Sequence, residues 1–102
     1  MRGPLAQPRA SMNNAEAREV LAQHLAHYRT LSYDELVRRQ GDVETAELTA
    51  PSGQTYQVEV EFLWEHRKGG AILVLGAVDD GGWRAFRPLT EDFIVRPTMP
   101  AG

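Results

Sequence analysis

From Val43 onwards, apolar and polar residues alternate along the chain, and glycine-containing turns interrupt this alternation about every dozen residues. The turns are Pro51-Ser52-Gly53, Lys68-Gly69-Gly70 and Asp79-Asp80-Gly81-Gly82. Because turns at such spacing connect neighbouring antiparallel strands, the pattern predicts a four-stranded meander. The expected strands cover residues 43–49, 55–66, 71–78 and 83–87.

The residues before these strands have a helical period instead. Asn13 or Asn14 can cap a helix that continues to about Arg29 and places its apolar side chains on one face. A second helix is expected to begin at Ser32, because Ser32 and Glu35 have the spacing of a capping box. Two helices followed by four strands predict an α+β domain in which both helices pack on one face of an antiparallel meander, in the order ααββββ.

The turns also predict which side chains share a face of the sheet. The first turn, with three residues, pairs Leu48 with Tyr56. The second turn, centred between residues 68 and 69, pairs Phe62 with Leu75. On this register, the side of the sheet that faces the helices carries Ala46, Leu48, Tyr56, Val58, Val60, Phe62, Trp64, Leu73, Leu75, Ala77 and Phe86.

Length and composition limit the class of protein. A chain of 102 residues supports one domain, and we expect a disordered leader at 1–10, a single α+β domain at 11–96 and a flexible tail at 97–102. The net charge of -3 disfavours a nucleic-acid-binding protein, and the absence of cysteine excludes disulfide and thiol chemistry. Without a signal sequence or an apolar membrane span, a cytoplasmic location with no membrane partner is expected.

The opposite side of the predicted sheet is more apolar than contact with water requires. Because apolar patches with a polar border tend to mark interfaces, this face is predicted to recognise a second copy of the chain or another protein. The alternative is that Gly76 only relieves crowding and that the C-terminal segment folds back over this face. Residues 88–95 are expected to close the sheet, with Leu89, Phe93 and Ile94 buried. The residues predicted to bind a partner on this face are Glu59, Glu61, Leu63, Ile72, Val74, Gly76, Trp83 and Arg87.

These features favour a non-enzymatic protein-interaction module of a regulatory or immunity-like kind, which acts by docking a protein partner or by homodimerisation. The alternative function is a small-molecule-binding protein or a minor enzyme. It would use a trough in which Glu61 and Gly76 lie side by side, with Glu61 as the base and Arg87 as an anion clamp. No nucleophile, base and orienting group form a recognisable triad, so no catalytic residue is predicted.

Metal and cofactor chemistry is not expected. His24 and His27 stand three residues apart on a helix, but no carboxylate follows at the next helical step. Asp79 and Asp80 resemble the start of a calcium loop, yet the alternating ligands and the terminal glutamate are missing. The Lys68-Gly69-Gly70 turn joins two strands and does not open a helix, which excludes a phosphate-binding loop there.

The run GAVDDGGWRAFRPLTEDFIV, from Gly76 to Val95, resembles the end of small bacterial domains of unknown function. In such domains a strand, an acidic glycine turn, an aromatic strand and a Pro-Leu segment follow one another. The resemblance implies a bacterial protein that stands alone. It assigns no activity, and it transfers no catalytic or ligand residue to this chain.

Overall fold

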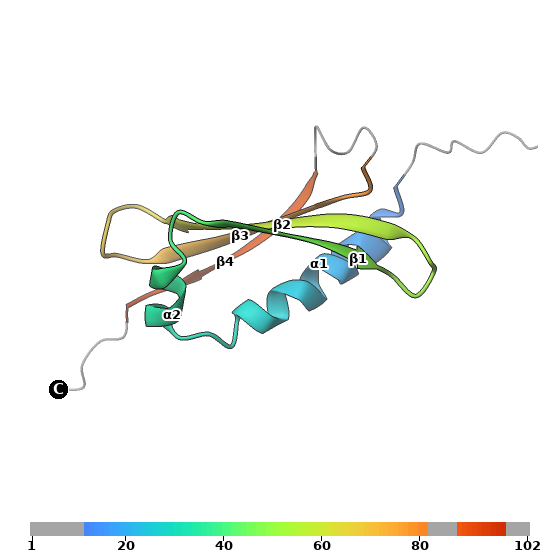
Figure 1. Cartoon of the computed structure of the whole chain (residues 1–102). Coiled ribbons are helices and arrows are strands. Elements are labelled where there is room, and N and C mark those ends of the chain that lie inside the picture. The colour runs from blue at the N-terminus through green and yellow to red at the C-terminus, as the bar shows by residue number, and fades with distance from the viewer. Residues whose placement is uncertain (1–11, 82–87, 98–102) are drawn as a thin grey trace, which may run out of the picture.

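The computed structural model describes residues 12–81 and 88–97 of the chain. Its elements are α1 (Asn14–Tyr28), α2 (Tyr33–Arg38), β1 (Val43–Thr49), β2 (Thr55–Trp64), β3 (Ile72–Asp79) and β4 (Leu89–Val95). Figure 1 shows both helices on one side of the sheet, which confirms the predicted α+β fold. The predicted leader at 1–10 lies outside the described residues, as does the tail beyond residue 97.

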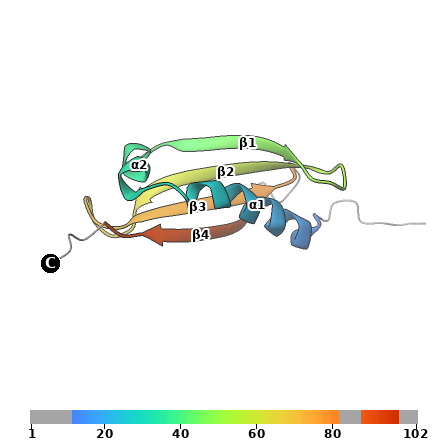
Figure 2. The same cartoon turned by 90° about the horizontal axis from the view of Figure 1, so that it is seen from below.

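The strands form one antiparallel sheet in the order β1-β2-β3-β4, with β1 and β4 at its two margins (Figure 2). β1 has the predicted bounds. The predicted fourth strand at 83–87 lies outside the described residues, and the strand that pairs with β3 is β4, the segment expected to close the sheet. The sequence of β4 does not alternate regularly, because Glu91 stands at a helix-side position and Ile94 at an outer-face position.

Local capping contacts determine where the helices begin. The Asn13 side chain accepts a hydrogen bond of 3.0 Å from the Glu16 amide and caps α1. At the start of α2, the Glu35 N–H donates to Ser32 Oγ (3.1 Å), and the Ser32 N–H donates to Glu35 Oε1 (2.9 Å). This reciprocal pair is the predicted capping box. Both predicted helix starts are therefore confirmed.

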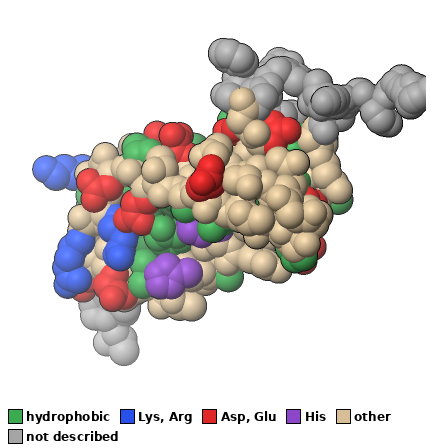
Figure 3. Space-filling view, turned by 45° about the vertical axis from the view of Figure 1, so that its right-hand side comes forward, with side chains coloured by type: hydrophobic (Ala, Val, Ile, Leu, Met, Phe, Trp, Pro, Cys, Tyr) green, Lys and Arg blue, Asp and Glu red, His purple; other side chains and the backbone are tan. Residues whose placement is uncertain are grey.

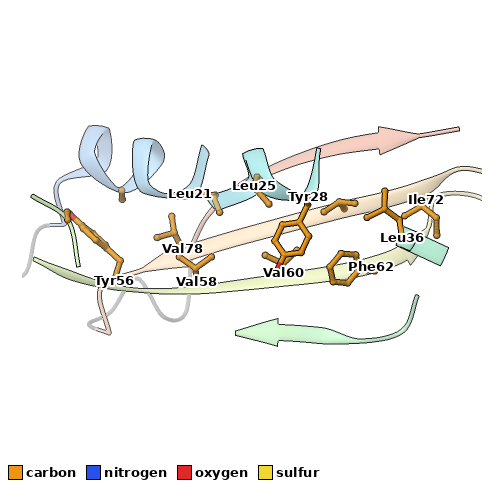
Figure 4. Close-up of a cluster of buried hydrophobic side chains, with 13 residues drawn as sticks. Leu21, Leu25, Tyr28, Leu36, Tyr56, Val58, Val60, Phe62, Ile72 and Val78 are labelled. Carbon is orange, nitrogen blue, oxygen red and sulfur yellow. The ribbon is translucent and has the colours of Figure 1, made fainter. Parts of the chain in front are cut away.

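The hydrophobic core lies between the helices and the sheet (Figure 4). Leu21 and Leu25 of α1 and Leu36 of α2 are at most 1% exposed. The ring of Tyr28 meets the ring of Phe62 edge-on, with 5.5 Å between their centroids. The buried hydrophobic residues are Ala17, Leu21, Leu25, Tyr28, Leu36, Ala50, Tyr56, Val58, Val60, Phe62, Ile72, Val74 and Val78.

The observed register agrees with the prediction in the first hairpin and differs in the second. Leu48 lies opposite Tyr56, as expected. Phe62 lies opposite Val74, whereas the sequence predicted Leu75. The register of β3 was therefore wrong by one residue, and every side chain of that strand faces the side opposite to the predicted one.

The cause is the number of residues in the β2–β3 connection. The Glu65 N–H donates to the Ala71 carbonyl (2.9 Å), so residues 66–70, an odd number, join the two strands. The predicted turn had an even number of residues. In Figure 4, Ile72 and Val78 point into the core between the helices and the sheet. The residues of β3 on the helix side are Ile72, Val74, Gly76 and Val78, in place of Leu73, Leu75 and Ala77.

β4 places one carboxylate on the helix side of the sheet. Glu91 Oε2 lies 3.3 Å from Arg29 Nη2, and the Arg29 guanidinium stands 4.4 Å from the centroid of the Phe93 ring. Leu89 and Phe93 are half-buried on this side. The predicted burial of Ile94 was wrong, because alternation along β4 turns this residue to the other face, where it is 40% exposed.

Candidate functional site

The outer face is the side of the sheet turned away from α1 and α2, and no helix of the described residues packs on it (Figure 1). It consists of the side chains that alternate with the core residues of each strand. They are Val43, Thr45, Glu47 and Thr49 of β1, Thr55, Gln57, Glu59, Glu61 and Leu63 of β2, Leu73, Leu75, Ala77 and Asp79 of β3, and Thr90, Asp92 and Ile94 of β4.

Three leucine and isoleucine side chains lie side by side across one end of the outer face. Leu63 is paired with Leu73, and Leu73 is paired with Ile94. We call these three residues the apolar patch. Leu63 is 36% exposed and Ile94 40%, and Val43 on the same face is 50% exposed. Leu73, between Leu63 and Ile94, is half-buried, and no helix of the described residues lies over the patch.

Carboxylates occupy the next two rows of the outer face beyond the apolar patch, and we call Glu59, Glu61 and Asp92 the acidic rim. The register places Leu75 between Glu61 and Asp92 in the row next to the patch. None of the three carboxylates forms an ion pair or hydrogen bond with another residue in 12–81 or 88–97. Figure 3 shows Asp and Glu side chains over much of one side of the molecule, and Lys and Arg side chains together with Asp and Glu at its left end.

Part of the predicted partner-binding set is on this face. Glu59, Glu61 and Leu63 lie on the outer face, as the alternation of β2 predicts. Trp83 and Arg87 lie outside the described residues, so their predicted roles stay predictions.

The remaining predicted residues belong to the core. Ile72 and Val74 are 0% exposed on the helix side. Gly76 is also buried there, and it lies opposite Val60 on β2 and Glu91 on β4. Their assignment to the partner-binding face was wrong, because the odd-length β2–β3 connection turns β3 over.

The predicted trough is not formed, because Glu61 and Gly76 lie on opposite faces of the sheet. Three residues that the sequence pattern placed in the core also lie on the outer face. Leu73 and Leu75 were predicted to be core residues, and Ile94 was predicted to be buried. The alternation within β3 and β4 was the available signal, but it does not say which of the two alternating sets faces the helices.

A polar cluster on the helix side joins α1 to β1. The Tyr28 hydroxyl donates to Glu44 Oε1 (2.6 Å), and Arg39 Nε lies 3.4 Å from Glu44 Oε2. Burial and the Glu44 carboxylate raise the pKa of Tyr28 to about 12. His24 and His27 make edge contacts with the Tyr28 ring. Because Tyr28 keeps its proton near neutral pH, this cluster is suited to holding the helix on the sheet and not to abstracting a proton.

A second buried tyrosine joins the other end of α1 to the sheet. The Tyr56 hydroxyl donates to Glu16 Oε1 (2.8 Å), and Ser52 Oγ donates to the same oxygen (2.9 Å). Burial and the Glu16 carboxylate raise the pKa of Tyr56 to about 12. No group of three or more metal-ligating His, Cys, Asp or Glu side chains occurs in the part of the chain that the structure describes.

Comparisons of the chain with protein-family models, with curated proteins and with solved structures give no match. The resemblance of the segment from Gly76 to Val95 to bacterial domains stays a prediction. Within residues 12–81 and 88–97, no helix has the length and apolar character needed to cross a bilayer.

Proposed function

We propose that this chain is a protein-interaction domain that docks a different protein on its outer face. The observation that supports the proposal is the apolar patch, in which Leu63, Leu73 and Ile94 lie side by side on the face opposite α1 and α2. Burial of apolar surface contributes about 25 cal/mol per Å². A partner that covers the patch would therefore gain free energy that the isolated chain does not recover.

The acidic rim indicates the chemistry of the partner. Glu59, Glu61 and Asp92 have no basic counterpart among the described residues, so a partner with Lys or Arg beside its apolar contact would complement them. A second copy of the chain docked on the same face would oppose carboxylate to carboxylate, which disfavours self-association there. A regulatory or immunity-like protein could use such a face to occupy a basic surface of its target.

Two synthetic peptides test this preference. Both contain the same leucines, and the residues between the leucines are lysine in one peptide and glutamate in the other. In an NMR titration, we expect the lysine peptide to shift the amide signals of Leu63, Leu73 and Ile94. The glutamate peptide should leave these signals unchanged, because it repels the acidic rim.

Variants of the full chain separate docking from nonspecific attraction. We expect Leu63→Ser and Glu61→Lys each to weaken binding of the lysine peptide about tenfold, which corresponds to the loss of one good contact. Ala22→Ser, at an exposed position of α1, is the matched control and should bind as the unaltered chain does. Equal binding of both peptides, or shifts confined to the helix side, would contradict the proposal.

A further inference from the structure

The two margins of the sheet are covered to different degrees. At β4, Arg29 of α1 reaches Glu91 and lies over Phe93, and Pro88 and Pro97 flank the strand. β1 pairs with β2 on one side, and no helix or strand of the described residues lies along its other side (Figure 2). β1 is therefore the less covered of the two edge strands.

The hydrogen bonds of the hairpins show which backbone groups of β1 point away from β2. The Ala50 N–H donates to the Gln54 carbonyl (2.8 Å), and the Phe62 carbonyl accepts from Gly41 at the far end of the pair (2.8 Å). Because hydrogen-bonded and non-hydrogen-bonded pairs alternate in an antiparallel ladder, every second residue of β1 has its N–H and C=O directed outwards. These residues are Val43, Thr45, Glu47 and Thr49.

β1 lacks three of the features that protect an open edge, although it carries Glu44 on the helix side and Glu47 on the outer face. It contains no proline, no lysine and no bulge over its seven residues. On the helix side its Ala46 and Leu48 are only half-buried, because α1 packs over β2, β3 and β4. Both the backbone and these side chains are thus available to an added strand.

We propose that a second copy of this chain pairs with β1 in the antiparallel direction, about a two-fold axis that passes through Ala46. This axis pairs Thr45 with the partner's Glu47 and Val43 with the partner's Thr49, so all the outward N–H and C=O groups find partners. The two sheets become one sheet of eight strands with all helices on the same side.

Two-fold axes through different residues of β1 would each give a symmetric dimer, and the charges of β1 favour the axis at Ala46. With the axis at Ala46, Glu44 lies opposite the partner's Leu48, and no two carboxylates are opposite each other. An axis at Glu47 would oppose that glutamate to its own copy, which is destabilising. An axis at Thr45 would leave Leu48 and Thr49 outside the pairing. The Ala46 register is the one that pairs all seven residues of β1 without opposing like charges.

Because the chain has no cysteine, one introduced cysteine can report the register. In the proposed dimer, the two copies of residue 46 form a non-hydrogen-bonded pair with Cβ atoms about 5 Å apart, close enough for a disulfide. We expect Ala46→Cys to form a covalent dimer on mild oxidation. Thr49→Cys is the matched control and should stay uncrosslinked, because its two copies are about 20 Å apart along the strands.

A proline at an outward position tests the backbone pairing itself. Thr45→Pro removes an N–H that points away from β2, so the fold is retained while the new ladder is broken. Thr45→Val keeps this N–H and serves as the control. The interface is small, so sedimentation equilibrium should extend to about 1 mM chain. We expect the unaltered chain and Thr45→Val to dimerise and Thr45→Pro to remain monomeric.

Three results would overturn the proposal: a monomer at every concentration, equal association of the two Thr45 variants, or equal crosslinking of the two cysteine variants. If Thr45→Pro fails to fold, as circular dichroism would reveal, the crosslinking comparison still decides. Glu61→Lys leaves β1 unchanged and should dimerise normally. Failure of peptide docking on the outer face and failure of dimerisation are therefore distinguishable.

Discussion

Gly76 lies directly against Leu21, and a Cβ atom built on the glycine would stand 2.9 Å from the Leu21 Cδ1 atom. The two δ-methyl carbons of Leu25 would each be 3.1 Å from the added Cβ atom. The absence of a side chain at position 76 lets α1 approach the centre of β3. The glycine is thus a packing residue of the core.

Replacing this glycine should separate the helix from the sheet. We expect Gly76→Val to lower the free energy of unfolding by about 1–3 kcal/mol, because the added methyl groups overlap the leucines of α1. Ala77→Val is the matched control on the outer face, and it should change the free energy of unfolding by less than about 0.5 kcal/mol. Urea denaturation of the three proteins measures the difference. Equal stability of both variants would mean that the helix does not approach β3 at residue 76.

The face of β3 can be tested with one carboxylate placed on either side of the strand. We expect Val74→Asp to unfold the chain, because an unpaired charge in the core costs several kcal/mol out of a total of about 5–15 kcal/mol. Leu73→Asp should remain folded, since its side chain lies on the outer face. Thermal unfolding followed by circular dichroism compares them. If Leu73→Asp unfolded and Val74→Asp stayed folded, the register predicted from the sequence would be the correct one.

Alkaline pH should loosen both ends of α1. Tyr28 and Tyr56 have pKa values raised from 10.0 to about 12, by burial and by the carboxylates of Glu44 and Glu16. Because the folded state holds these protons more tightly, the stabilisation is complete below pH 10 and is lost as the pH rises through 12. Ultraviolet titration of tyrosinate should show that Tyr28→Phe and Tyr56→Phe each lack one late-ionising group. Loss of an early-ionising group in either variant would contradict this assignment.

The capping box makes α2 sensitive to acid. The hydrogen bonds from the Ser32 N–H and hydroxyl lower the pKa of Glu35 from 4.5. The stabilisation from this ionised carboxylate is therefore present above pH 4.5 and is lost as the pH falls through the lowered pKa. We expect Ser32→Ala to cost about 1 kcal/mol of unfolding free energy and to bring the Glu35 pKa back towards its ordinary value in an NMR titration. The variant keeps the Ser32 N–H, so an unchanged Glu35 pKa would exclude only the contribution of the Ser32 hydroxyl.

Short-range patterns in the sequence predicted several elements correctly. The caps at Asn13 and Ser32 involve residues three apart in the chain, and the first hairpin has a three-residue loop that sets the register of β1 and β2. Such signals depend on a few neighbouring residues, so they can be recognised before the fold is known. The helices, the bounds of β1 and the helix-facing side of β2 follow from them.

The sequence by itself determined the layers of this protein, because capping pairs and alternation act between near neighbours. Only the tertiary structure decided which side of β3 faces the helices, since both sets of alternating residues in that strand are apolar and an odd-length loop selected between them. It also decided that residues 89–95 form a strand. Glu91 lies on the helix side there, where Arg29, 62 positions earlier in the chain, forms an ion pair with it. Contacts at such a separation exist only once the chain has folded.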